Sequence, residues 1–345
     1  MLLAACGGVQ QTQNTAEKDL SRNEADPRAS SATPLEVAVP VPSAPGLTEA
    51  PSQPDAVAHL PSGCDAAIAV DLAKLSNHAA VAKEIMPRLE RLISATSNDA
   101  SAQRFQQFVK ESGLELRRLR GLAVCVHAEE GTETTATVLL DAGLRPGTVV
   151  PALLKSRNPS KPAPNLTESG GAQFIGDEEM TATQFADGVV GFGESVARLK
   201  LAMKAGDNAR AYKLDRTRDL TFFVGKDLVQ SGVASRFNKS SEFLDGVEQL
   251  TGTADLSTGR LQLFVHASSV DGAKKVDALT TLVKDLVVKE GKVPKQFGAD
   301  AALKSLNSRL DGSNVILEAT FPAKGITDAA KFIGAQLDAK IAKSK

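Results

Sequence analysis

The chain is poor in large aromatic residues. Its 345 residues include no tryptophan and one tyrosine, and aromatic residues make up 4% of the total. Surfaces on which sugar rings or bases stack are built mainly from Trp and Tyr. The 13 phenylalanines fall mostly in apolar patterns that are typical of a core. The composition therefore disfavours carbohydrate binding and the binding of single-stranded nucleic acid.

An excess of charge of either sign is also absent. Lys and Arg number 40 and Asp and Glu number 41, which gives a net charge of -1. Nucleic-acid binding needs a basic excess that displaces counterions, so we expect no nucleic-acid partner. No run of 18 apolar residues occurs, and none of the chain is therefore predicted to be an internal transmembrane helix. The hydrophobic fraction of 42% is enough for one large domain or two small ones.

Catalytic and metal-binding motifs are missing as well. No histidine has a second ligand at metal spacing, and neither H-E-x-x-H nor G-x-S-x-G occurs. We therefore predict no catalytic residue, no bound metal and no cofactor. The histidines are His59, His78, His127 and His266, of which His127 and His266 each end a predicted strand and would meet only if two halves of the chain stacked.

Two short segments have features of ion-binding sites, but a turn is the simpler interpretation of each. Gly191 to Ser195 links a strand to a helix whose first amides could receive an anion. A tight turn capped by Glu194 or Ser195 explains it better. The acidic run Asp177 to Glu179 lacks the spacing of a calcium loop, so we expect a solvated turn.

The first residues read Met1-Leu2-Leu3-Ala4-Ala5-Cys6. Leu3-Ala4-Ala5-Cys6 resembles the lipobox of bacterial lipoproteins. The resemblance implies cleavage before Cys6 and attachment of a diacylglyceryl group to its thiol. Only five residues precede Cys6, whereas a signal peptide needs a basic region and about 7–15 apolar residues. We therefore expect the natural start to lie upstream of this chain; the alternative is a cytosolic protein that happens to carry these four residues.

Residues 7–56 have the composition of a disordered tether. They hold seven of the sixteen prolines, three bases, seven acids and no aromatic residue. Such a segment buries too little apolar surface to offset its loss of conformational entropy on ordering. Fifty residues of coil reach roughly 40 Å, enough to hold a domain away from a membrane. Together with Cys6, the tether predicts a membrane partner reached through a lipid anchor and a location in the cell envelope, facing the periplasm or the exterior.

The rest of the chain predicts an α+β fold. Hairpin patterns favour mainly antiparallel sheet, with helices packed on one face. The predicted strands are 66–72, 121–128, 134–141, 172–176, 181–186, 188–193, 220–224, 247–256, 260–268 and 313–321. The predicted helices are 79–95 (kinked or split by Pro87), 100–112, 146–157, 195–205, 271–290, 295–310 and 325–342, the last with Ile326, Ala330, Ile333, Leu337 and Ile341 buried.

The order of elements repeats, which predicts two related α+β units, 57–214 and 215–345, that share one sheet. The match is one of element types and not of residues. With Leu60-Pro61 ahead of the first strand, the arrangement also resembles tandem-repeat exported bacterial proteins of unknown function. That resemblance implies no activity.

Two further cysteines, Cys64 and Cys125, leave two alternatives. In an oxidising compartment they form a disulfide if the first strand and the strand 121–128 are neighbours. Otherwise they are small buried thiols.

The sequence is compatible with three functions. The favoured one is a non-catalytic envelope module that binds a protein, cell-wall or lipid partner. The second is a carrier of a lipid or another apolar ligand, which an open apolar cavity would favour. The third is a hydrolase with a dispersed active site, which would need at least two of His127, His266, Asp71 and Glu194 within hydrogen-bond reach in one pocket.

Overall fold

The computed structural model describes residues 55–94, 100–128, 134–157, 163–176, 181–203, 208–234, 246–290 and 296–343. All of them belong to one compact unit, Ala50–Lys345. Cys6 and nearly all of the predicted tether lie outside the described residues. Within the described part of the chain, no helix combines the length and the apolar character that crossing a bilayer requires.

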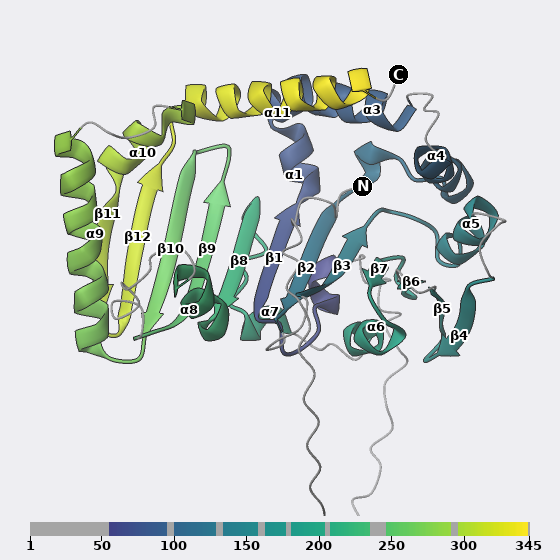
Figure 1. Cartoon of the computed structure of the whole chain (residues 1–345), viewed down its shortest axis with the longest axis horizontal. Coiled ribbons are helices and arrows are strands. Elements are labelled where there is room, and N and C mark those ends of the chain that lie inside the picture. The colour runs from purple at the N-terminus through teal and green to yellow at the C-terminus, as the bar shows by residue number, and fades with distance from the viewer. Residues whose placement is uncertain are drawn as a thin grey trace, which may run out of the picture. The chain divides into compact units, whose positions relative to one another are not determined.

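The described strands form one twelve-stranded sheet in which every neighbouring pair is antiparallel (Figure 1). The strand order is β11-β12-β10-β9-β8-β1-β2-β3-β7-β6-β5-β4. The strands are β1 (Ala66–Asp71), β2 (Gly121–His127), β3 (Thr135–Asp141), β4 (Asn165–Ser169), β5 (Ala172–Gly176), β6 (Thr181–Gln184), β7 (Val190–Gly193), β8 (Leu220–Gly225), β9 (Val247–Asp255), β10 (Arg260–Ala267), β11 (Asn307–Asp311) and β12 (Asn314–Thr320).

The α+β class predicted from the sequence is confirmed, with helices between the strands. The α-helices are α1 (Leu72–Asn77), α2 (Ala79–Glu84), α3 (Met86–Ser94), α4 (Ala100–Ser112), α5 (Val149–Ser156), α6 (Val196–Met203), α7 (Asn208–Ala211), α8 (Lys226–Ala234), α9 (Val270–Glu290), α10 (Ala299–Ser305) and α11 (Ala323–Lys343). Short 3₁₀ helices are η1 (Ala56–His59), η2 (Leu116–Arg118) and η4 (Gln296–Gly298).

Helices lie on both faces of the sheet. On one face, Val150 and Ala152 of α5 pack against the β3 to β7 region together with α4, and Val276 of α9 packs against Val265 and Val315. On the other face lie η1 and α6. The prediction of helices on one face therefore holds for α4, α5, α8 and α9 but is wrong for α6. The reason is local: Gly191 has no side chain, and a Cβ there would lie 3.1 Å from Leu199 of α6.

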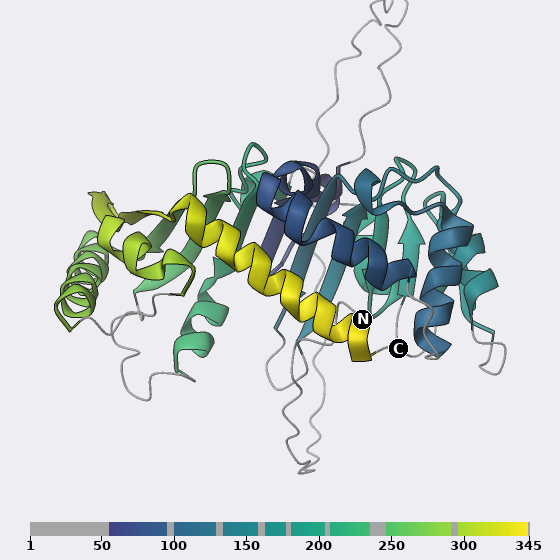
Figure 2. The same ribbon diagram turned by 90° about the horizontal axis from the view of Figure 1, so that it is seen from above.

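Strands from both predicted segments, 57–214 and 215–345, lie in this one sheet of a single compact unit, and β1 is the strand at which the two segments meet. It pairs with β2 on one side and with β8 on the other, with Ala67 opposite Cys125 and Phe223. Helix α11 crosses one end of the strands beside α2 and α3, as the view from above shows (Figure 2). Asp338 of α11 accepts hydrogen bonds from Arg88 (2.7 Å) and Arg91 (3.0 Å) of α3, which ties the C-terminal helix to the first half.

Several predicted elements need correction. The segment 79–95 does split as Pro87 predicted, into α2 and α3. Residues 307–310, predicted as helix, belong instead to the edge strand β11, because Gly312 (φ +61°) turns the chain into a hairpin with β12. The edge strand β4 lies in a segment predicted as loop. Ala330 and Ile341 of α11 are buried as predicted, but Ile333 is 47% exposed, since Gly334 and not Ile333 lies on the packed side.

Candidate functional site: a central apolar face

Strands β1 and β2, at the centre of the sheet, are apolar at nearly every position. Strand β1 reads Ala66-Ala67-Ile68-Ala69-Val70, and β2 is similarly rich in Val, Leu and Ala. Such continuous apolar runs are typical of strands that are covered on both sides, because an antiparallel strand with one wet face alternates apolar and polar residues. The flanking strands β8 and β3 do alternate in part, with Thr221 and Thr137 on the face opposite to their apolar side chains.

One face is covered. On β1 and β2 it carries mainly small side chains, with Ala67, Ala123 and Cys125 fully buried. Leu60, directly after η1, and Tyr212, after α7, pack on it in the largest hydrophobic cluster of the described residues. The small side chains let η1 approach closely, so this face is the packed core of the domain.

The opposite face carries the larger side chains, and they are not buried. Every side chain on it is apolar, all are at least partly exposed, and Ile68 has 39% of its surface accessible. The strand registers place these residues in three rows across the four strands. This central apolar face comprises Leu220, Phe222 and Val224 of β8, Ala66, Ile68 and Val70 of β1, Leu122, Val124 and Val126 of β2, and Ala136, Val138 and Leu140 of β3.

Helices flank the central apolar face on two sides. Figure 1 shows α8 on the β9 side and α4 with α5 on the β7 side, with the central strands between them. Leu140, at one corner, contacts the cluster formed by α4 and α5. Three strand spacings give a width of about 14 Å, and residues 66 to 70 give a length of about 13 Å. The twelve side chains thus form one contiguous, partly exposed apolar patch among the described residues.

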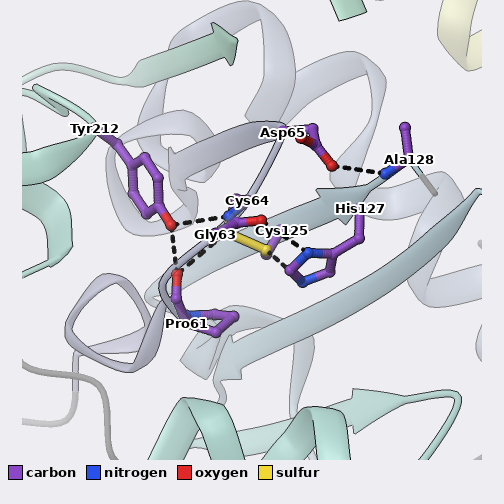
Figure 3. The surroundings of a disulfide bond; sticks show 8 residues. All are labelled: Pro61, Gly63, Cys64, Asp65, Cys125, His127, Ala128 and Tyr212. Carbon is purple, nitrogen blue, oxygen red and sulfur yellow. Dashed lines mark hydrogen bonds between the residues drawn. A yellow bond between two sulfur atoms is a disulfide. The ribbon is translucent and has the colours of Figure 1, made fainter. Parts of the chain in front are cut away.

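The disulfide lies directly behind the central apolar face (Figure 3). Cys64 and Cys125 are bonded to each other across a sequence separation of 61 residues, with their Cα atoms 5.4 Å apart. The bond holds the lead-in to β1 against β2. Tyr212 completes the arrangement, since its hydroxyl donates to the Pro61 carbonyl (2.6 Å) and accepts from the Cys64 amide (3.0 Å). Burial raises the pKa of Tyr212, so this hydroxyl stays a donor at neutral pH.

His127 is buried beside this disulfide. Its Nδ1 lies 3.0 Å from the Gly63 carbonyl, which can only accept, so Nδ1 is the donor. Its Nε2 lies 3.1 Å from Cys125 Sγ. Cys64, Cys125 and His127 form the one group of three potential metal ligands found among the described residues. Because the two sulfurs are bonded to each other, neither is a thiolate, and the group supplies no metal site in this state.

The remaining candidate residues lie apart from one another. His266 is on β10, four strand spacings or about 19 Å from His127. Asp71 caps α1 by accepting from the Lys74 amide (2.9 Å), and His59 pairs with Asp187 (2.8 Å). The described residues therefore do not form the catalytic pocket that a hydrolase would need. Ser195 caps α6 by accepting from the Arg198 amide (3.3 Å), as the tight-turn interpretation predicted. Asp177 to Glu179 lie outside the described residues.

Comparisons with known proteins found only a weak structural similarity. No protein-family model matches the chain, and no curated protein matches it. Among solved structures, crystal forms I and III of TP0453 match with TM-scores of 0.42 and 0.45 and identities of 11% and 12%. Each match covers 82% of this chain and 98% or 99% of TP0453. At these values the likeness bears on neither the function nor the site of this chain.

Proposed function

We propose that this protein is a lipid-anchored, non-catalytic protein of the bacterial cell envelope that binds the acyl chain of a lipid on its central apolar face. The observation that carries the proposal is the inverted burial of the central strands. In β1 and β2 the small residues are buried, whereas Ile68 and Val124, together with Phe222 of β8, remain accessible on the other side. Covering such side chains stabilises a complex by about 25 cal/mol for each Å² removed from water.

The chemistry of the face favours an acyl chain over a protein partner. A protein interface of this kind has a polar rim and hydrogen bonds, about one for each 100–200 Å². The central apolar face offers no polar side chain in any of its three rows. An acyl chain needs no hydrogen bonds and adapts to a flat strip between two helical walls. A lipid ligand also fits the envelope location that Cys6 and the tether predict.

A binding assay tests the ligand. The purified chain is titrated into vesicles that contain a phospholipid with a pyrene-labelled acyl chain, and extraction of the labelled lipid is followed by loss of pyrene excimer fluorescence. We expect stoichiometric uptake by the native chain. The double substitution Ile68→Gln and Val124→Gln should weaken uptake at least tenfold, because two buried amides would then lack partners.

The matched control is Leu282→Gln on α9, where a leucine that is 55% exposed lies outside the central apolar face. It should leave uptake unchanged. Equal uptake by all three proteins would overturn the proposal. A native dimer that the double substitution converts to monomer, without any lipid uptake, would identify a second copy of the chain as the occupant instead.

The anchor is tested separately. Cells that express the gene with its upstream start restored are labelled with a palmitate analogue, and Cys6→Ser serves as the control. We expect label on the native protein and none on the variant. Absence of label on both would remove the lipid anchor and, with it, the proposed envelope location.

A further inference from the structure

A second surface lies on the disulfide face of the sheet, beyond the packed core. Strands β9, β10 and β12 are covered on their other face by α8 and α9 but carry no described helix on this one. Their registers give three rows of side chains: Gln249, His266 and Asn314; Thr251, Phe264 and Ile316; Thr253, Gln262 and Glu318. An apolar strip is thus bordered on both sides by polar rows, and the surface is hollowed to about 400 Å³.

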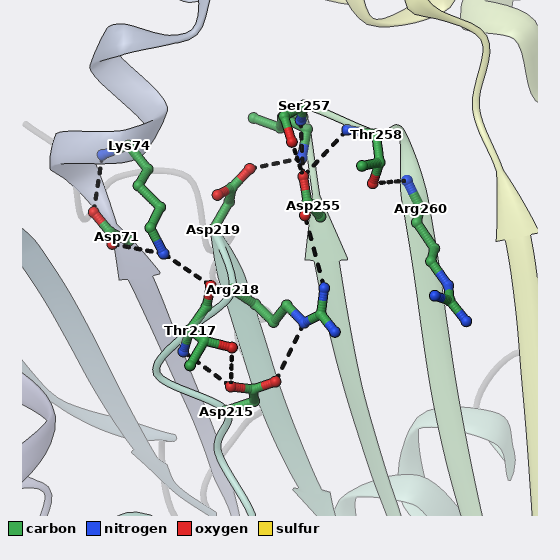
Figure 4. Close-up of polar contacts among 11 residues, drawn as sticks. Asp71, Lys74, Asp215, Thr217, Arg218, Asp219, Asp255, Ser257, Thr258 and Arg260 are labelled. Carbon is green, nitrogen blue, oxygen red and sulfur yellow. Dashed lines mark hydrogen bonds and ion pairs between the residues drawn. The ribbon is translucent and has the colours of Figure 1, made fainter.

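A fixed wall bounds this polar hollow on the side of β8. The wall is the segment that contains Lys213 and Asp215. Asp215 accepts from Thr217 Oγ1 (2.6 Å) and Arg218 Nε (3.2 Å), and the same arginine lies 3.7 Å from Asp255 at the end of β9 (Figure 4). Lys74 Nζ donates to the Thr217 carbonyl (2.8 Å), which joins the wall to α1. The wall is therefore held by contacts with two elements, β9 and α1.

Most polar groups of the two rows already have partners. Gln262 Nε2 donates to Glu318 Oε1 (2.7 Å), which leaves the amide oxygen of Gln262 as an acceptor. His266 Nδ1 lies 2.8 Å from Asn314 Oδ1, and its Nε2 lies 3.9 Å from Glu248 Oε2.

The uncommitted donor is Gln249 Nε2, which is buried and has no hydrogen-bond partner among the described residues. An unpaired buried donor costs about 1–3 kcal/mol, which a ligand acceptor would offset.

The charges of the hollow indicate an uncharged ligand. Asp215 is paired with Arg218, and Lys213 faces a lining that also contains Asp311, so no excess of one sign remains. An anion site would need clustered cations, and a cation site would need clustered carboxylates. Amides and hydroxyls that both donate and accept suit the hydroxyl and acetamido groups of sugars.

We infer that the polar hollow binds a neutral oligosaccharide, with one sugar ring lying on Phe264, which is partly exposed beside the buried Ile316, and its polar edges reaching the rows of Gln249 and Gln262. A pyranose has an apolar face and hydroxyls at its rim, which matches an apolar strip between two polar rows spaced about 6.8 Å on either side. The composition disfavours carbohydrate binding because Trp and Tyr are scarce, but this geometry needs a single Phe. The inference does not depend on lipid binding, since the two surfaces lie on opposite faces.

Saturation-transfer NMR on the full chain tests the inference with three probes: chitotetraose, cellotetraose and maltotetraose. We expect transfer to at least one of them. Phe264→Ala should raise its Kd at least tenfold, and Gln249→Leu, which keeps the shape but removes the amide, at least threefold. Phe222→Ala, on the central apolar face, is the matched control and should leave the Kd unchanged within twofold while it weakens lipid uptake.

Circular dichroism establishes that each variant is folded, and Gln249→Leu carries the test if Phe264→Ala is not. No transfer to any of the three probes would overturn the inference. So would a Kd that neither Phe264→Ala nor Gln249→Leu changes, or one that only Phe222→Ala raises. Failure of lipid uptake with intact saccharide binding would overturn the proposed function alone.

Discussion

Ala67 is fully buried, whereas Ile68, the next residue in the same strand, is 39% exposed. Successive side chains of a β-strand point to opposite faces of the sheet, so Ala67 lies on one face of β1 and Ile68 on the other. In a sheet with one covered face, the larger side chain normally points to the core because it removes more apolar surface from water. In β1 the order is reversed: the small Ala67 lies under η1 and Tyr212 in the packed cluster, and the larger Ile68 lies outside it.

Substitutions at these two positions should therefore have unequal effects on stability. Ala67→Leu inserts three extra carbons into a filled site and should lower the free energy of unfolding by about 1–3 kcal/mol. Ile68→Thr keeps β-branching on an accessible face and should cost less than about 1 kcal/mol. Urea unfolding followed by circular dichroism measures both. A larger loss for Ile68→Thr would show that Ile68 is part of the folding core.

Loss of the disulfide should be costly. The bond between Cys64 and Cys125 closes a loop of 61 residues, for which chain entropy gives a stabilisation of about 4 kcal/mol. The double variant Cys64→Ala and Cys125→Ala should lower the unfolding free energy by that order. Adding dithiothreitol should destabilise the native chain similarly and leave the double variant unchanged. Cys6→Ser is the control, which should retain the sensitivity to reductant.

Much of this fold could be predicted from the sequence, because hydrophobic periodicity and turn residues are signals carried by residues close together in the chain. Pro87 divides the first long helical segment, and the pattern Val-His-Ala ends both β2 and β10, as expected. The edge strands β4 and β11 were not predicted because few of their side chains are buried, so their sequences lack the alternation of apolar and polar residues that marks a strand. The spacing of Leu303, Leu306 and Leu310 matches the apolar stripe of a helix. The residues from Asn307 onward nevertheless form a strand, because they pair with β12.

The two candidate sites could not be predicted from the sequence alone. Strands β1 and β2 are apolar at nearly every position, so periodicity cannot tell which face is covered. The polar hollow combines Gln249, Phe264 and Asn314 from three strands, and only the sheet register brings them together. The sequence does contain one usable signal, since a strand that is apolar on both sides within an antiparallel sheet is typical of a strand that is covered on both faces.

Removing the hydroxyl of Tyr212 should test how tightly the core face is held. Tyr212→Phe leaves the Pro61 carbonyl and the Cys64 amide without their partner in a buried site. We expect a loss of about 1–3 kcal/mol in the free energy of unfolding. Because the chain has one tyrosine and no tryptophan, unfolding of this variant is followed by circular dichroism. A change below about 0.5 kcal/mol, which is ordinary for a surface substitution, would show that water satisfies both groups.

The ion pair between His59 and Asp187 should make stability depend on acid pH. His59 stacks on Phe185 at 4.3 Å and pairs with Asp187 at 2.8 Å, which fastens η1 to the turn between β6 and β7. Burial alone would raise the pKa of Asp187, but hydrogen bonds from His59 and the Val189 amide, together with the His59 charge, lower it below its usual value. Ionised Asp187 therefore stabilises the fold at every pH above the unfolded-state pKa of about 3.9.

That stabilisation is lost as the pH falls through the lower pKa of the folded state, because protonation then breaks the pair. At pH 6, Asp187→Asn should lower the free energy of unfolding by about 1 kcal/mol. The difference between the native chain and the variant should shrink below about pH 4 and vanish in stronger acid. Urea unfolding from pH 2.5 to 6 measures it, and a double-mutant cycle with His59→Gln isolates the pair. A difference that stays constant across this range would assign the effect of Asp187→Asn to packing and not to its charge.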